Sequence, residues 1–407
     1  MRLTEQPDVR EIDLFGTSVR ANPYPHYQRL REKEPVHWST RHSTWVITKY
    51  DHALSLLGNP HVRHWGVCQQ QTDSENQPQS SFERVVGKWL SLLDPRTHST
   101  LRKLTVEVFE PKALNQIGSM IQELANTLID RAEHIGSLDV IKGFADPLAL
   151  TSIGEILGIP AKSRARFQRL AHAMVGRLFE TVGAFSKQAS GPVGPAEFSA
   201  YMQELLRQKR NHLDQDLLSA LLNAQCNDNL EEEDIISFLA FFLFAGHENI
   251  MNFVGNAVCA LASCPCEFSL LRENETLLGA AVEELLRYDS PVQFMAVKIS
   301  DDIQLAGKTI RPDEQVFVCI GAANRDPERF FEPNRLDFAR PNNHHLSFGH
   351  GPLTCLGASL ARLEGRIAIG SIVRKLRRLV VQGPLVWRRT PPVLRGLESL
   401  LLEFDTD

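Results

Sequence analysis

The stretch Phe348–Gly370, "FGHGPLTCLGASLARLEGRIAIG", places one cysteine among glycines and directly before an apolar, alanine-rich run. Backbone N–H groups and a helix N-terminus stabilise a thiolate that binds a metal. Such donors reach a sulfur where no side chain intervenes, and Gly349, Gly351 and Gly357 offer those positions around Cys355. The pattern predicts a loop folded beneath the sulfur with a helix starting behind it. For any single cysteine, the ordinary alternative is a buried side chain beside a glycine turn.

The spacing within this stretch is more specific than its composition. It reads F-G-x-G-x-x-x-C-x-G followed by A-x-x-L-A-R-x-E, and it resembles the haem-binding signature of the cytochrome P450 family. The resemblance implies that Cys355 is the axial thiolate ligand of a haem b iron (iron protoporphyrin IX) and donates electron density to it. It also implies that Phe348 packs beside the sulfur and shields it from water, and that Gly349 and Gly357 belong to the cofactor-binding loop.

A second motif, "EELLR", places Glu284 and Arg287 three residues apart on one face of a helix. On its own, such a pair is most often a solvated ion pair that contributes little to stability. In the family, this E-x-x-R pair is joined by an arginine from the irregular segment before the cysteine, and Arg335 in "PNRLDF" stands in the matching place. The resemblance therefore implies a structural triad of Glu284, Arg287 and Arg335 that holds this segment under the haem.

A third motif, "DPRTHSTLRKL", resembles the family's D-P-x-x-H-x-x-x-R and places His98 and Arg102 four residues apart. Both fall on one helical face and suit the anionic haem propionates, although a surface histidine and arginine are the plain alternative. His345 in "HHLSFG" is a further propionate candidate. Leu353 and Val297 stand where the family usually has basic residues, so we expect His98 and Arg102, with His345 as a weaker candidate, to carry more of the propionate binding.

The segment "FLAFFLFAGHENIMNFVGNAV" predicts a long apolar helix that could be plain core. Gly246 costs about 1 kcal/mol relative to alanine inside a helix, and a buried Glu248 is costly without a partner or a role. The family pattern A-G-x-[DE]-T implies that Ala245 and Gly246 make room for dioxygen and that the acid supplies protons. Asn249 replaces the threonine: it positions a water that carries the proton, contacts substrate, or marks different chemistry. We favour the first.

The composition excludes several classes of protein. In 407 residues, 43% are hydrophobic and 23% charged, and the net charge of −5 provides no basic field for nucleic acid. The N-terminus has no apolar signal region, and the most apolar run, Ile235–Gly246, is shorter than the roughly 20 residues that span a bilayer. We expect a cytoplasmic protein without a membrane partner. The seven cysteines contain no C-x-x-C pair, which argues against a disulfide framework and a cysteine-based zinc site.

The order of the patterns predicts one domain over residues 1–407. A hairpin is expected at "VHWST" and "TWVITK", helices dominate Asp94–Tyr288, short strands cover Pro291–Phe317, and a helix runs from the cysteine to about Leu379. The resemblance covers nearly the whole chain. It implies a mainly α (α+β) fold, a triangular helical domain with small β-sheets, with haem between the long central helix and the helix after Cys355.

The function implied by the resemblance is that of a haem-thiolate monooxygenase that inserts one oxygen atom from O2 into an organic substrate. Apolar residues at the expected substrate pocket, Phe241, Phe244, Phe294 and Met295, predict a largely hydrophobic substrate. Natural-product tailoring of a small molecule, free or tethered to a carrier protein, is the expected setting. The chain carries no flavin or nicotinamide motif, so electrons from NAD(P)H must arrive through a ferredoxin or flavodoxin with its reductase.

Two alternative functions remain at this point. One is a haem-thiolate enzyme that performs desaturation, coupling, rearrangement or peroxide-driven oxidation. The observation that suggests it is Asn249 in place of the family's threonine. The other is a catalytically silent haem-binding module that recruits a partner. Glu248 beside Gly246 argues against the silent module, since such a module has no evident need for a buried acid at that place.

Overall fold

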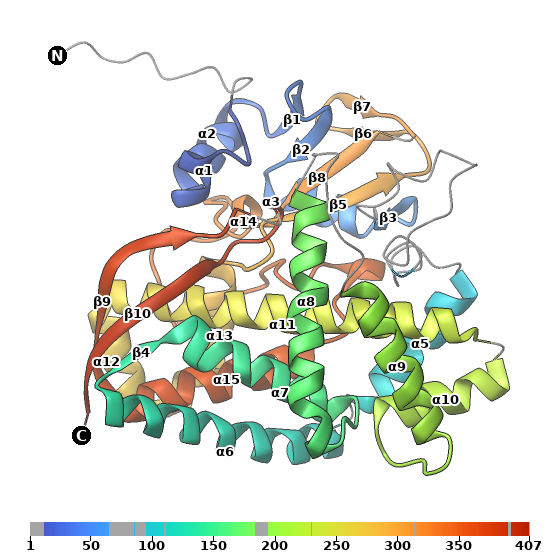
Figure 1. Cartoon of the computed structure of the whole chain (residues 1–407). Helices are drawn as coiled ribbons and strands as arrows, with labels where there is room; N and C mark the ends of the chain where they lie inside the picture. The colour runs from blue at the N-terminus through green and yellow to red at the C-terminus, as the bar shows by residue number, and fades with distance from the viewer. Residues whose placement is uncertain are drawn as a thin grey trace.

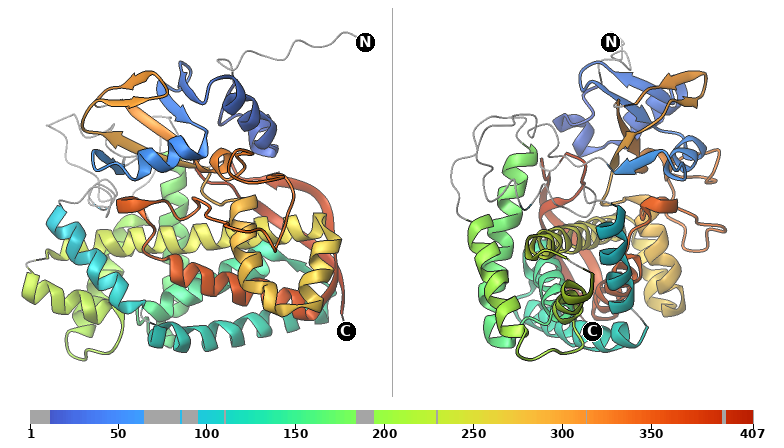
Figure 2. Two further views of the ribbon diagram at one scale, coloured as in Figure 1. Left: turned by 180° about the vertical axis from the view of Figure 1, so that it is seen from behind. Right: turned by 90° about the vertical axis from the view of Figure 1, so that its right-hand side faces the viewer.

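The computed structural model describes residues 12–64, 85, 95–109, 111–183, 194–228, 230–312, 314–389 and 392–406 (Figure 1). Helices form the larger part of the molecule, and a strand-rich part lies on one side of them in each view (Figure 2). The main helices are α5 (Pro95–Val108), α6 (Pro111–Ile135), α7 (Asp146–Ile156), α8 (Arg164–Gly183), α9 (Pro195–Lys209), α10 (Leu217–Asp228), α11 (Glu232–Ser263), α12 (Pro265–Glu273), α13 (Leu278–Tyr288) and α15 (Ala358–Lys375).

The strand-rich part holds a five-stranded sheet in the order β1-β2-β8-β5-β3, in which only β2 and β8 are parallel. The predicted hairpin is confirmed, since β1 pairs antiparallel with β2. The elements of this part are α1 (Thr17–Ala21), α2 (Tyr24–Lys33), β1 (Val36–Ser39), β2 (Thr44–Ile47), α3 (Tyr50–Leu57), β3 (Val62–His64), β5 (Phe294–Ile299), β8 (Gln315–Cys319), α14 (Ile320–Ala323) and the hairpin β6 (Ile303–Leu305) with β7 (Lys308–Ile310).

A second sheet, in the order β4-β10-β9, packs beside the helices. Its strands are β4 (Ser137–Asp139), β9 (Leu376–Trp387) and β10 (Leu397–Thr406). The predicted end of the helix after the cysteine was four residues too late, because α15 ends at Lys375 and Leu376 already begins β9. The following "LRRLVVQGPLVW" is rich in β-branched valine and contains glycine and proline, so it favours a strand over a continued helix.

Helix α11 runs through the helical part and positions the site. It begins with a capping box, in which Glu231 and Asp234 each accept a hydrogen bond from the other's backbone N–H. By length and composition α11 could cross a membrane, but 61% of its apolar window is buried inside the protein, as in a core helix. Gly255 permits close packing, since a Cβ there would lie 2.4 Å from Ile141 Cδ1 in the π-helical segment Val140–Ala145.

Glu364 on α15 is a buried carboxyl group in this helical core, 2% exposed, with Ser152 of α7 as its polar neighbour. Burial raises the pKa of Glu364 to about 8, and the Ser152 hydroxyl opposes that shift only in part. The folded protein therefore holds a proton that the unfolded chain releases near pH 4.5. Stability should be lost as pH rises from about 4.5 to about 8, because the folded state binds more protons over that interval.

We expect Glu364→Gln to remove this pH dependence. The stability of the variant relative to the wild type should improve by about 3 kcal/mol between pH 5 and pH 8, the linkage free energy of such a shift. Urea unfolding of the two haem-loaded proteins across that range measures the difference. Parallel stability curves for the two proteins would show that Glu364 is ionised in the folded state.

Candidate haem-thiolate site

The loop that carries Cys355 is folded by two glycines in left-handed conformations. Gly349 has φ +72° and Gly351 has φ +59°, and a Cβ on Gly349 would lie 2.5 Å from the carbonyl oxygen of Leu353. The Cys355 N–H donates to the Phe348 carbonyl oxygen at 2.8 Å and closes the loop. We predicted that all three glycines give backbone donors access to the sulfur. The structure shows that Gly349 and Gly351 serve the turn and that Gly357 adjoins the sulfur, its ideal Cβ 4.0 Å from Sγ, while access to the sulfur past Gly349 and Gly351 stays a prediction.

The surroundings of the Cys355 sulfur fit a metal-binding thiolate. The side chain is exposed, although protein packed around the sulfur raises the pKa of the thiol by desolvation. A hydrogen bond from the Gly357 N–H and the charges of Arg362 and Arg102 act in the opposite direction. A bound metal cation would complete the deprotonation that these donors favour. Helix α15 begins directly after Gly357, as predicted.

The predicted propionate contacts fall in different places. Arg102 on α5 reaches the cysteine loop, where its Nη1 lies 3.4 Å from the Thr354 carbonyl oxygen. His98 also belongs to α5, but its side chain lies outside the described residues. The buried His345 ring faces a carboxylate instead of an open position, with Nε2 3.3 Å from Glu283 Oε2. Propionate binding by these residues stays a prediction, and the contact of Arg102 with the loop is consistent with it.

A salt bridge lies next to Phe348 beneath the loop. The Arg362 guanidinium donates to both carboxylate oxygens of Glu283 at 2.8 and 2.9 Å and stacks over the Phe348 ring at 4.4 Å. Burial raises the pKa of Glu283, but His345 and Arg362 outweigh it and lower that pKa to about 2. Phe348 is thus held on one face by a charged pair.

The Glu284–Arg287 pair is confirmed, whereas the third member of the triad was predicted wrongly. Arg287 donates to both oxygens of Glu284 at 2.8 Å, and both side chains are fully buried. The guanidinium of Arg335 is 67% exposed and pairs with Glu332, and only its backbone carbonyl accepts a bond from Arg287. Arg340 takes the place instead, with Nε 3.1 Å from each oxygen of Glu284.

The segment Ala245–Asn249 of α11, which we predicted to take part in oxygen activation, holds a buried acid next to an amide with an unpartnered acceptor. Burial raises the pKa of Glu248, while Arg388 and His247 oppose this shift. The Asn249 amide donates to the Ala245 carbonyl oxygen at 3.0 Å, and its buried Oδ1 has no hydrogen-bond partner among the described residues. Gly246 allows close packing with α7, because its Cβ would lie 3.2 Å from Ile153 Cδ1.

Sequence reasoning missed Arg388, which donates to Glu248 Oε2 at 2.7 Å. Arg388 follows β9 and is 140 residues away from Glu248 in the chain, in a stretch "WRRT" that carries no motif. It also missed His247, whose Nδ1 lies 3.5 Å from Glu248 Oε1. A buried carboxylate needs a partner. The apolar surroundings of Glu248 in the sequence were therefore the only signal that a basic residue from elsewhere in the chain pairs with it.

The predicted pocket residues separate into two groups. Phe241 and Phe244 on α11 are half-buried against the core formed by α8, α9 and α10, and Met295 lies beside the cysteine loop near Gly349. Phe294 is 3% exposed and packs edge-on against Phe15 and Tyr27 in a core cluster, and its place in the substrate pocket stays a prediction. Successive side chains of a strand point to opposite faces, so β5 turns Phe294 away from the face that carries Met295.

Comparison with known proteins identifies the class. The sequence profile of the family "Cytochrome P450" matches residues 194–392. The chain is 34% identical to the "Biotin biosynthesis cytochrome P450" of Bacillus subtilis over 94% of this chain and 96% of that one. It is 33% identical to "Cytochrome P450 monooxygenase PikC" of Streptomyces venezuelae over 98% of this chain and 96% of that one. The fold is similar to that of P450BioI, which was solved in complex with an acyl carrier protein ligated to hexadec-9Z-enoic acid. The superposition has a TM-score of 0.87 at 32% identity and covers 96% of this chain and 100% of that chain.

The protein therefore belongs to the cytochrome P450 family and is an oxidoreductase with this family's fold, which confirms the predicted fold class. The family implies a haem cofactor, and the residues present fit one. The exposed Cys355 thiol beside the Gly357 N–H would hold the iron, and Arg102 of α5 contacts the same loop at the Thr354 carbonyl oxygen. The buried Asn249 Oδ1 on α11, which has no hydrogen-bond partner among the described residues, is a further polar group that a bound ligand or water could contact.

Proposed function

We propose that the protein is a haem-thiolate monooxygenase that inserts one oxygen atom from O2 into a largely hydrophobic substrate in biosynthetic tailoring. Haem bound to Cys355 supplies the oxygen activation and redox chemistry. The observation that carries the proposal is the buried Glu248, held by Arg388 next to the free Oδ1 of Asn249. A chain that only stored haem would have no use for a desolvated acid held at this place.

In this proposal, the residues of α11 deliver protons. Burial raises the pKa of Glu248 and favours its protonated form, while Arg388 at 2.7 Å holds the carboxyl group in place. One N–H of the Asn249 amide donates to the Ala245 carbonyl oxygen, and the unpartnered Oδ1 is the acceptor available to orient a water molecule. An amide is a poor proton carrier compared with a hydroxyl, so the water, not Asn249, would transfer the proton.

A substrate tethered to a carrier protein is the favoured form of the substrate. P450BioI, which is similar over 96% of this chain, was solved with an acyl carrier protein that bears hexadec-9Z-enoic acid. The half-buried Phe241 and Phe244 suit an apolar chain of this kind. Optical titration of the ferric protein with free fatty acids and polyketide-like compounds, and with the same acyl groups on a carrier protein, tests the assignment.

A change of the haem iron to high spin only with the tethered forms would support the carrier protein as a partner. A change with the free compounds would indicate that the enzyme acts on free small molecules. Product analysis in the presence of a ferredoxin or flavodoxin and its reductase tests the oxygen insertion itself. Turnover only with peroxide, or products of desaturation or coupling, would favour the alternative chemistry. No reaction under any of these conditions would favour the silent module. The cytoplasmic location stays a prediction.

Electron transfer from a separate acidic protein would occur on the face that carries the cysteine. Lys103 and Arg366 are exposed there, whereas Arg362 is engaged by Glu283 and stacked on Phe348. Because Lys103 and Arg366 are more exposed than Arg362, we assign partner binding to these two residues in preference to Arg362. Charge complementarity affects association rates more than affinity, so the reduction rate should fall with added salt.

We expect Asn249→Ala to raise the fraction of reducing equivalents released as hydrogen peroxide by about tenfold, which corresponds to roughly 1.4 kcal/mol. The variant loses Oδ1, and with it the acceptor that orients the water. Peroxide and product are measured together against NAD(P)H consumed, and Asn249→Thr serves as the matched control that restores a hydroxyl. Equal coupling in the wild type and Asn249→Ala would contradict the water-positioning role.

A further inference from the structure

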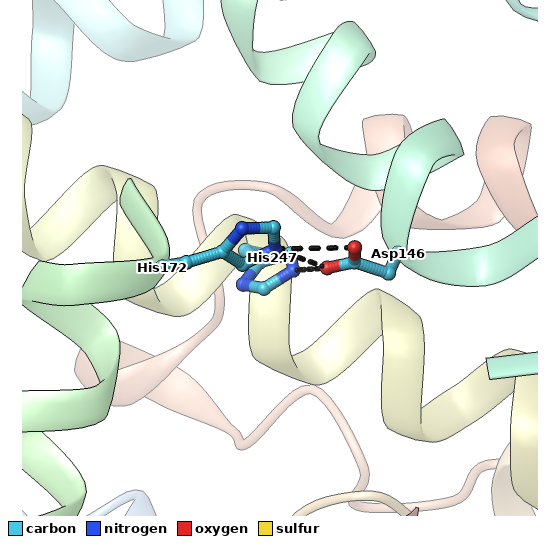
Figure 3. A group of neighbouring side chains, drawn as sticks. All are labelled: Asp146, His172 and His247. Carbon is cyan, nitrogen blue, oxygen red and sulfur yellow. Dashed lines mark hydrogen bonds and ion pairs between the residues drawn. The ribbon is translucent and has the colours of Figure 1, made fainter. Parts of the chain in front are cut away.

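Three side chains from three helices meet at one point beside the oxygen-activating segment. His172 belongs to α8, Asp146 is the first residue of α7, and His247 lies on α11 (Figure 3). Both imidazoles direct Nε2 to the same carboxylate. His247 Nε2 lies 2.6 Å from Asp146 Oδ1, and His172 Nε2 lies 3.0 and 3.1 Å from the two carboxylate oxygens.

We propose that Asp146, His172 and His247 bind one divalent transition-metal ion, with Zn2+ as the best match. Two imidazole nitrogens and one carboxylate oxygen are a ligand set that Zn2+ favours. The three donor atoms all lie within 4.8 Å of one another. Around a tetrahedral zinc with bonds of about 2.0–2.1 Å, donor atoms are roughly 3.3 Å apart. Small side-chain movements therefore convert the hydrogen-bonded cluster into a coordination site.

The site also places a carboxylate near the second ring nitrogen of His247, where a metal-binding histidine makes its outer contact. A histidine that coordinates through one nitrogen usually donates the other N–H to a carboxylate, which fixes its tautomer. His247 is 3% exposed, and its Nδ1 has no hydrogen-bond partner within the described part of the chain. This Nδ1 lies 3.5 Å from Glu248 Oε1, and Arg388 holds the other oxygen of that carboxylate. Metal on Nε2 would place the remaining proton between Nδ1 and Glu248.

The three proposed ligands differ in their exposure to solvent. The His172 side chain is 51% exposed, Asp146 is 21% exposed and His247 is buried. An ion can enter from solvent, and a water molecule can occupy the fourth position. The bound ion would join α8 to α7 and α11 and restrain His247 beside Glu248. This site is separate from Cys355 and goes beyond the proposed monooxygenase function.

Isothermal titration of the untagged, haem-loaded protein with ZnCl2 tests the site. Haem occupies Cys355 in this form, and iodoacetamide blocks the other accessible thiols beforehand. We expect one ion per chain with a Kd near or below about 10 µM, and His172→Ala to weaken it by at least about tenfold. His172 is largely exposed, so its removal leaves the fold intact. His212→Ala is the matched control, because His212 is an exposed histidine beside a single carboxylate, Asp214.

Retained stoichiometric binding in His212→Ala and its loss in His172→Ala would support the site. Zinc X-ray absorption of the wild type should then show two imidazoles and one carboxylate as ligands. Equal affinities for the wild type and His172→Ala, or no saturable binding by the wild type, would overturn it and leave a hydrogen-bonded cluster that joins three helices. Because the titration needs neither substrate nor electron donor, its failure is independent of the monooxygenase proposal.

Discussion

Cys355→Ser is expected to lower turnover by at least about a hundredfold, or roughly 2.7 kcal/mol in the activation barrier. A serine hydroxyl is nearly isosteric with the thiol but does not ionise under these conditions, so it cannot donate electron density to the iron as a thiolate does. The loop itself should persist, because it is held by the Cys355 N–H bond to Phe348 and by the conformations of Gly349 and Gly351. Product formation and the carbon monoxide difference spectrum of the reduced protein measure the effect.

Cys266→Ser is the control for this substitution. Cys266 is an exposed cysteine on α12, away from the cysteine loop, and its replacement should leave both the spectrum and turnover unchanged. The red-shifted carbon monoxide band that a thiolate ligand produces should disappear only in Cys355→Ser. Survival of that band in the variant would show that another residue binds the iron, and the assignment of Cys355 would be wrong.

The parts of this protein that sequence predicted well are those with a regular spacing. The Glu284–Arg287 pair follows from the helical repeat, which places residues three apart on one face, and α13 confirms it. The loop at Cys355 follows from glycines at fixed distances before a helix, and α15 begins where the pattern ends. Local geometry decides both features, so neither depends on the path of the rest of the chain.

Residues that depend on the path of an irregular segment were harder to place. Arg335 and Arg340 both lie in "RLDFAR", which has no period that would show which guanidinium turns inward. The structure turns Arg340 toward Glu284 and leaves Arg335 at the surface. The cluster of Asp146, His172 and His247 was likewise hidden, because its members come from three helices and share no motif.

The largest loss of stability is expected from Arg287→Ala, at about 3–5 kcal/mol, the cost of breaking a buried ion pair. The variant leaves the Glu284 carboxylate fully buried with Arg340 as its remaining charged partner. It also removes the donors to the carbonyl oxygens of Asn324 and Pro333, at 2.9 Å each, which tie the segment before the cysteine to α13. Urea unfolding of the haem-loaded protein measures the change, and haem release from the variant should be faster.

Two further arginine variants distinguish the triad seen in the structure, which contains Arg340, from the predicted triad, which contains Arg335. Arg340→Ala removes both 3.1 Å contacts with Glu284 and should cost about 3 kcal/mol. Arg335→Ala removes an exposed side chain paired with Glu332, and should change stability by no more than about 0.5 kcal/mol. The opposite order of these two effects would mean that Arg335, not Arg340, completes the triad in solution. Equal, small effects of Arg340→Ala and Arg335→Ala would mean that Arg287 alone neutralises Glu284, because the loss of either of the other two arginines would then leave stability unchanged.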